Sequence, residues 1–209
     1  MRLTLAGPAG PLEALLEEPA PEPSRFAVLC HPHPLYGGTM ENKVVWTLAR
    51  ALEAEGIATL RFNFRGVGSS AGRFAGGAGE TDDARAVLSF GQARWPGARV
   101  VLAGFSFGAY VALRLAGEAA PERLITVAPP VGLAAPLERL SVEGLPVPAC
   151  PWLIVQGDAD EVVDGRAVVS WARALSPAPS LRVLPGVGHY FHGALGTLRE
   201  AVRDAVRSG

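Results

Sequence analysis

The chain has 209 residues, of which 49% are hydrophobic and 19% are charged, and its formal net charge is −1. This length can bury one sizeable core but is short for two domains, so we expect a single domain over residues 1–209. The near-neutral charge provides no basic surface for a phosphate backbone, so nucleic acid is not an expected partner.

The N-terminal residues and the cysteines indicate a cellular compartment. Residues 1–23 contain glutamates and prolines where a secretory signal would have a continuous apolar segment. No run of the sequence approaches the roughly 18 apolar residues that cross a bilayer. Two cysteines, Cys30 and Cys150, are too few for a disulfide framework. We therefore expect a cytoplasmic protein with reduced thiols and no membrane partner.

Short apolar segments alternate with longer helical ones along most of the chain. Segments 2–5 and 12–16 predict an edge hairpin, and continuous apolar runs then predict buried parallel strands. The expected strands are 26–30, 58–62, 100–103, 124–127, 153–155 and 181–184. The expected helices are 42–55, 81–94, 107–118, 165–175 and 195–207. The alternation predicts an α/β fold with a doubly wound, mostly parallel sheet flanked by helices.

A Gly-x-Ser-x-Gly motif occupies residues 104–108, between an expected strand and an expected helix. In this strand–turn–helix context the motif is typical of a nucleophile elbow, which exposes a serine on a strained turn. Gly104 and Gly108 lack the Cβ atoms that would crowd the neighbouring strand and helix. Ser106 is therefore a candidate nucleophile, although 25 glycines could also produce the pattern in an ordinary turn.

Acidic residues and histidines follow later strands of the predicted sheet. Asp158, Asp160 and Glu161 come after one strand, and His189 and His192 come after the next. The resulting order of serine, acid and histidine is the chain order of α/β-hydrolases, and chymotrypsin-like and subtilisin-like enzymes use other orders. A histidine with a pKa near ~6.5 can accept the serine proton, and an acid can orient the imidazole.

Two loops carry a resemblance to a known family. Residues 31–45 read HPHPLYGGTMENKVV, and residues 62–70 read FNFRGVGSS. From residue 26 onward the chain resembles small, lidless α/β-hydrolases with an HPHP…GGTM.NK loop. The resemblance implies an α/β-hydrolase fold without a cap domain, and esterase-type chemistry. It also implies Asp160, in a Gly-x-x-Asp placement, as the orienting acid and His189 as the base.

An ester hydrolase of this kind needs two N–H donors for the oxyanion. The Phe107 amide is one of them by the geometry of an elbow. The second is expected in the loop after residue 30, where the prolines have no N–H, so His33, Leu35 and Tyr36 remain. Leu35 is favoured because the resemblance places it where the family's loop turns back toward its two adjacent glycines.

These residues predict a serine hydrolase, specifically a carboxylesterase that cleaves small-molecule esters through an acyl-enzyme without metal or organic cofactor. The alternative is a non-catalytic α/β-hydrolase-like protein that binds a small ligand or a partner. His31 and His33 lack an acidic cluster at ligand spacing, so we expect them to shape the loop. Arg65 could bind an anionic substrate group, but we expect it to bind loop carbonyls instead. Asp82 and Asp83 are expected to favour a helix N-terminus.

Overall fold

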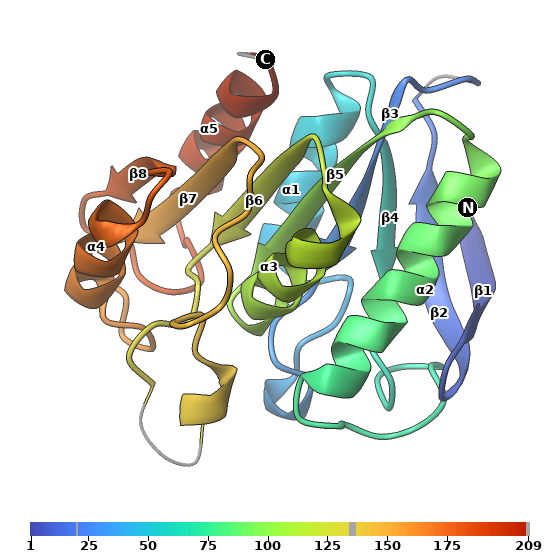
Figure 1. Cartoon of the computed structure of the whole chain (residues 1–209), viewed down its shortest axis with the longest axis horizontal. Coiled ribbons are helices and arrows are strands. Elements are labelled where there is room, and N and C mark those ends of the chain that lie inside the picture. The colour runs from blue at the N-terminus through green and yellow to red at the C-terminus, as the bar shows by residue number, and fades with distance from the viewer. Residues whose placement is uncertain (20, 134–136, 208–209) are drawn as a thin grey trace.

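Eight strands form one sheet in a computed structural model that describes residues 1–19, 21–133 and 137–207. Their order is β1-β2-β4-β3-β5-β6-β7-β8 (Figure 1). Strands β4, β3, β5, β6, β7 and β8 run parallel, whereas β2 is antiparallel to both β1 and β4. Together with the flanking helices, this arrangement confirms the predicted fold class.

The expected elements are present, with small shifts at their ends. The strands are β1 (Arg2–Gly7), β2 (Gly10–Glu17), β3 (Arg25–Cys30), β4 (Ala58–Phe62), β5 (Arg99–Phe105), β6 (Arg123–Val127), β7 (Trp152–Gly157) and β8 (Ser180–Leu184). The helices are α1 (Lys43–Glu53), α2 (Ala78–Arg94), α3 (Phe107–Ala119), α4 (Gly165–Ala174) and α5 (Leu195–Arg207), with 3-10 turns η1 (Pro34–Tyr36) and η2 (Glu138–Leu140).

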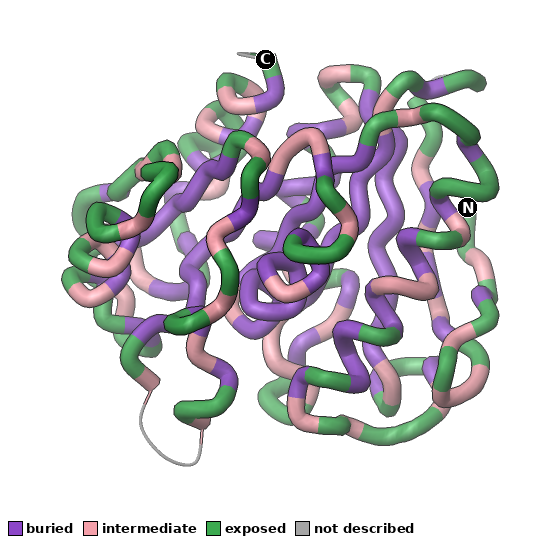
Figure 2. Tube along the Cα trace, in the orientation of Figure 1, coloured by how far each residue is buried: buried purple, intermediate pink, exposed green. Residues whose placement is uncertain are grey.

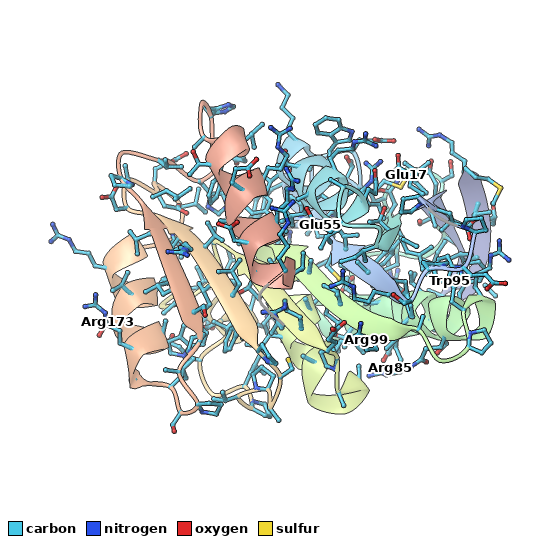
Figure 3. The ribbon with its side chains drawn as sticks, turned by 90° about the horizontal axis from the view of Figure 1, so that it is seen from above. Glu17, Glu55, Arg85, Trp95, Arg99 and Arg173 are labelled. Atoms are coloured by element: carbon cyan, nitrogen blue, oxygen red, sulfur yellow. The ribbon has the colours of Figure 1, made fainter. Side chains whose placement is uncertain are left out.

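Helices cover both faces of the sheet. Helices α1 and α5 pack on one face, and α2, α3 and α4 pack on the other (Figure 1). Figure 2 shows the buried strands running between these layers. Glu55, just beyond α1, accepts hydrogen bonds from Arg203 and Arg207 of α5 at 2.8 and 2.9 Å (Figure 3). The central strands are apolar on both faces because both are covered.

The loops after the parallel strands meet at the carboxyl edge of the sheet, where α/β folds bind ligands. Between β6 and β7, the described residues contain only the short turn η2, and residues 134–136 of this segment lie outside the described residues. None of the helices in the described part of the chain has the length and apolar character that a bilayer-spanning segment requires.

A buried ion pair holds the loop after β4 to helix α2. The carboxylate of Asp83 is fully buried and accepts from Arg65 Nε at 3.0 Å and Arg65 Nη2 at 2.8 Å. It also accepts from the Arg65 backbone N–H at 3.0 Å. The expectation that Arg65 binds loop carbonyls was therefore wrong. Asp83 is a partner of this arginine rather than a residue that only favours a helix terminus.

Asp83→Ala should lower the free energy of unfolding by about 3–5 kcal/mol, because it leaves the Arg65 guanidinium without its buried carboxylate. Asp82→Ala is the matched control, since Asp82 pairs with Arg85 at the surface and such pairs contribute about 1 kcal/mol or less. Urea unfolding of both variants measures the difference. Equal, small losses would contradict a stabilising role for the buried pair.

Candidate functional site

Ser106 lies in a strained turn between β5 and α3, with φ 54° and ψ −119°. A Cβ atom on Gly104 would lie 2.0 Å from the Gly108 carbonyl oxygen. A Cβ atom on Gly108 would lie 2.1 Å from the Cys30 carbonyl oxygen. Only glycine permits these approaches, so the motif brings the first turn of α3 against the loop after β3.

The structure brings Ser106, His189 and Asp160 together at the carboxyl edge of the sheet. His189 Nε2 lies 3.1 Å from Ser106 Oγ, and His189 Nδ1 lies 2.8 Å from Asp160 Oδ2. A carboxylate only accepts hydrogen bonds, so His189 Nδ1 carries the proton toward Asp160. The lone pair of His189 Nε2 then faces the serine hydroxyl, which is the arrangement needed for removing its proton.

The carboxylate of Asp160 is held by the backbone of its own loop. Asp160 Oδ1 accepts from the N–H groups of Val162 and Val163 at 2.9 and 2.8 Å. Burial raises the pKa of Asp160, but hydrogen bonds from His189 and Val163 outweigh it and leave the pKa below its usual range. Asp160 therefore stays ionised at neutral pH and can stabilise a charged imidazole.

The alternative acids and the alternative histidine occupy other positions. Asp158 Oδ1 accepts from the Gly186 N–H at 2.6 Å. Glu161 Oε2 accepts from the backbone N–H of His189 at 3.0 Å, and this bond lowers the pKa of Glu161. His192 is exposed, with its ring 6.1 Å from the ring of Tyr190. Asp158 and Glu161 thus position the loops around the histidine, and neither orients its ring.

His31 joins two loops of the site through both of its ring nitrogens. Its Nδ1 lies 2.7 Å from the Pro32 carbonyl oxygen, and its Nε2 accepts from the Phe64 N–H at 3.0 Å. Both nitrogens are therefore engaged by protein groups, which agrees with the expected loop-shaping role. Complete burial lowers the pKa of His31 to about 4, so the ring is neutral at physiological pH.

The three candidate amides of the loop after β3 differ in their hydrogen bonds. The Leu35 N–H donates to His33 Nδ1 at 3.2 Å, and the Tyr36 N–H donates to the His33 carbonyl at 3.1 Å. Among the hydrogen bonds of the described residues, the His33 N–H alone of the three has no acceptor. The preference for Leu35 therefore does not fit the geometry, because its proton already serves the 3-10 turn.

Comparison with known proteins identifies the family. The model of the family described as serine aminopeptidase S33 matches residues 27–148, more than half of the chain. The chain belongs to this family of α/β-hydrolases. A lidless α/β serine hydrolase from Xanthomonas campestris is 45% identical, with a TM-score of 0.92 over 100% of this chain and 94% of that one.

Two further relatives cover almost the whole chain. An α/β serine hydrolase homologue from Coxiella burnetii is 44% identical, with a TM-score of 0.88, over 98% of this chain and 96% of that one. An uncharacterized protein from Rickettsia prowazekii is 34% identical over 206 residues, which are 95% of this chain and 85% of that protein. The family match and the solved structures from Xanthomonas campestris and Coxiella burnetii support a serine hydrolase class for this α/β-hydrolase.

Exposed apolar side chains lie on the loops that carry the candidate site residues. The large hydrophobic side chains of Leu35, Tyr36, Val162 and Tyr190 are all about half exposed or more. They come from the loops after β3, β7 and β8, which also carry the candidate site residues. We call these four residues the apolar rim.

Aromatic rings continue the apolar rim toward the elbow. The His33 ring lies 4.8 Å from the Tyr36 ring, 4.7 Å from the Phe74 ring and 5.0 Å from the Phe107 ring. Phe107 directly follows the serine. A ligand at Ser106 would therefore meet apolar and aromatic groups.

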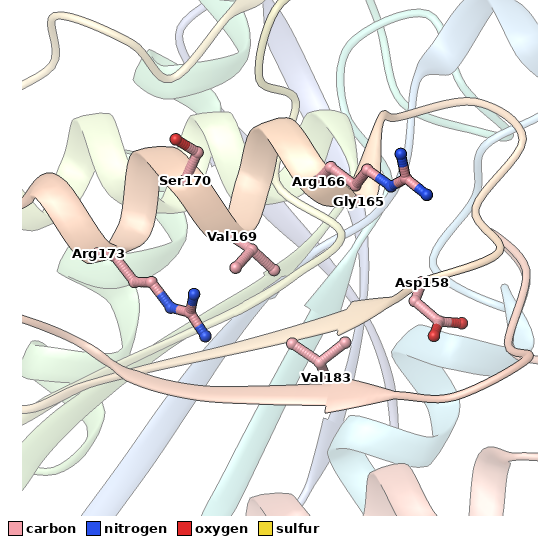
Figure 4. Close-up of a pocket in the computed structure, with 7 residues that line it drawn as sticks. All are labelled: Asp158, Gly165, Arg166, Val169, Ser170, Arg173 and Val183. Atoms are coloured by element: carbon pink, nitrogen blue, oxygen red, sulfur yellow. The ribbon is translucent and has the colours of Figure 1, made fainter.

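A separate groove lies between α4 and the edge strand β8, with a volume of about 370 Å³ (Figure 4). Val169 and Val183 face each other across it, and Arg166 and Arg173 extend over it from α4. Ser106 and His189 do not line this groove. This groove is therefore not part of the candidate catalytic site, which lies at the carboxyl edge of the sheet.

Lowering the pH from 7 to 5 should cost about 2 kcal/mol of unfolding free energy through His31. The imidazole of the unfolded chain binds a proton near pH 6.5, whereas the buried ring binds one only near pH 4. The contribution of His31 to the free energy of unfolding is thus fully present above pH 6.5 and is lost as the pH falls toward 4. In urea unfolding, His31→Gln should lose about 2 kcal/mol less than the wild type over this interval. The same loss in both proteins would contradict the prediction.

Proposed function

We propose that this α/β-hydrolase is a serine carboxylesterase that cleaves small, uncharged esters through an acyl-enzyme. The observation that carries the proposal is the continuous hydrogen-bonded series from Ser106 Oγ through His189 to the buried Asp160. Ser106 is the nucleophile, His189 is the general base and Asp160 orients the imidazole. The membership of the serine aminopeptidase S33 family supports a reaction at a carbonyl group.

The reaction proceeds in two balanced halves. His189 Nε2 takes the proton of Ser106 as Oγ attacks the ester carbonyl carbon, and the carbonyl oxygen becomes an oxyanion. The C–O bond to the alcohol then breaks, and the imidazolium returns its proton to the leaving alcohol. In the second half, His189 takes a proton from water, whose oxygen attacks the acyl-enzyme. Collapse of this intermediate releases the acid and returns the proton to Ser106.

Two backbone N–H groups stabilise the oxyanion in this proposal. Phe107 supplies one from the first turn of α3, where N–H groups have no acceptor within the helix. His33 supplies the other, because the N–H groups of Leu35 and Tyr36 are engaged in the 3-10 turn. The close contact between Gly108 and Cys30 supports this pairing, since it holds the two backbones against each other. One such donor contributes about 3–4 kcal/mol to transition-state binding.

The apolar rim supports an uncharged ester rather than a peptide as the substrate. An aminopeptidase binds the charged α-amine of its substrate beside the nucleophile, and such a charge needs a paired acceptor. Asp160 is occupied by His189 and its own loop, and Glu161 accepts from the His189 backbone. Apolar acyl and alcohol groups, in contrast, gain free energy by covering the exposed rim.

Ser106→Ala should lower kcat for p-nitrophenyl acetate by about 10⁴-fold or more, because the acyl-enzyme cannot form. Ser170→Ala is the control, since Ser170 is an exposed serine on α4. Initial rates and the burst of nitrophenol measure the effect. If the wild type hydrolyses no ester but binds a small ligand as tightly as Ser106→Ala does, the protein is the non-catalytic alternative.

The rim should make longer acyl chains better substrates. Each buried CH₂ contributes about 0.8 kcal/mol, so kcat/KM should rise about fourfold per group from acetate toward hexanoate. Tyr36→Ser should remove much of this rise, whereas Val183→Ser, at an exposed apolar residue of the separate groove, should keep it. An identical chain-length profile in the wild type and Tyr36→Ser would rule out a contribution of the rim.

A further inference from the structure

Gln156 is a buried polar residue at a position where the strand pattern calls for an apolar one. It lies on β7 with no exposed surface, on the same side of the strand as Trp152 and Ile154. Its Oε1 is buried and has no hydrogen-bond partner among the described residues. A buried unpaired oxygen destabilises a fold, so packing alone does not account for glutamine here.

The amide nitrogen of Gln156 points at the site. Gln156 Nε2 donates to Asp160 Oδ2 at 3.1 Å and to the Gly157 carbonyl oxygen at 3.0 Å. Both neighbours are acceptors only, which assigns the nitrogen rather than the oxygen of the amide to this side. Asp160 Oδ2 is the same oxygen that accepts from His189 Nδ1.

The carboxylate of Asp160 therefore accepts four hydrogen bonds, two at each oxygen. Val162 and Val163 hold Oδ1, whereas His189 and Gln156 share Oδ2. Among the hydrogen bonds of the described residues, the Asp160 oxygen that faces the imidazole has Gln156 as its only donor besides the imidazole itself. The rigid strand β7 thus determines the direction in which this oxygen presents its second lone pair.

We infer that Gln156 is a positioning residue, which aims the Asp160 carboxylate at His189 from within the sheet and thereby sets the proton affinity of the base. This inference rests on the proposed function of His189 as general base. The unpaired Oε1 is then explained, since an amide that must point its nitrogen at Asp160 has to leave its oxygen in the apolar core.

Gln156→Met tests positioning apart from folding, because methionine fills a similar volume without polar atoms. Its midpoint of thermal unfolding should equal or exceed that of the wild type, since the unpaired oxygen is gone. Its kcat on p-nitrophenyl butyrate should fall about tenfold with KM within about twofold, because orientation and not substrate contact is lost. Activity within twofold of the wild type would overturn the inference.

Thr126→Val is the matched control for a lost buried hydrogen bond. Thr126 lies on the neighbouring strand β6 and accepts from Trp152 Nε1 at 2.9 Å. This variant should lower thermal stability without a tenfold loss of kcat. Equal losses of kcat in Thr126→Val and Gln156→Met would show that any polar deletion in this core disturbs the site, which would also overturn the inference.

Gln156→Glu tests whether a donor to Asp160 Oδ2 is enough. At this fully buried position beside Asp160, the introduced carboxyl should stay protonated and donate to Asp160 Oδ2 in place of the amide, so kcat should remain within about twofold of the wild type. Asp160 and Glu161, the acidic groups that contact the His189 residue, are unchanged in this variant. A loss of kcat in Gln156→Glu as large as that in Gln156→Met would contradict the inference.

Nuclear magnetic resonance separates failure of this inference from failure of the proposed function. Titration of the His189 ring needs no substrate, so it can be followed even if the wild type hydrolyses no ester. A titration curve of the His189 ring that differs between Gln156→Met and the wild type supports the positioning role. Identical titration curves in the two proteins reject it, whatever the activity.

Discussion

The first turn of α3 lies so close to β5 and to the loop after β3 that no Cβ atom fits at Gly104 or Gly108. This close approach forces Ser106 into its left-handed backbone conformation and directs its side chain away from the sheet. It also puts the free amide of the first α3 residue beside the loop that contains His33. In the proposed function, the nucleophile and the oxyanion amides are therefore positioned by backbone packing, before any substrate is present.

Hydrogen bonds from polar side chains give the surrounding loops the same rigidity. Asp160, Glu161 and Asp158 each accept backbone N–H groups in the loops after β7 and β8. On the other side of the site, His31 joins the loops after β3 and β4, and Asp83 holds Arg65. Such loops need little rearrangement on binding, which suits a site that is open at the sheet edge.

The sequence predicted the parts that depend on local pattern. Apolar runs gave the parallel strands, and the spacing of motifs selected Ser106, Asp160 and His189, which the structure brings within hydrogen-bond distance. The proposal of His33 in place of Leu35 depends on the His33 side chain, which accepts the Leu35 N–H, and no sequence pattern encodes that contact.

Gln156 directly follows the apolar run 153–155, and no motif in the sequence singles it out. The hydrogen bond of Gln156 to Asp160, like the pairing of Arg65 with Asp83, arises only when segments fold back on one another.

The central claim is that three side chains distant in the sequence act together, with Asp160 orienting His189 and His189 taking the proton of Ser106. Covalent labelling by a fluorophosphonate tests it most directly. Mass spectrometry should locate the adduct on Ser106 in the wild type, and His189→Ala should slow its formation about 10³-fold or more. Labelling of Ser106 at the same rate in both proteins would contradict the claim.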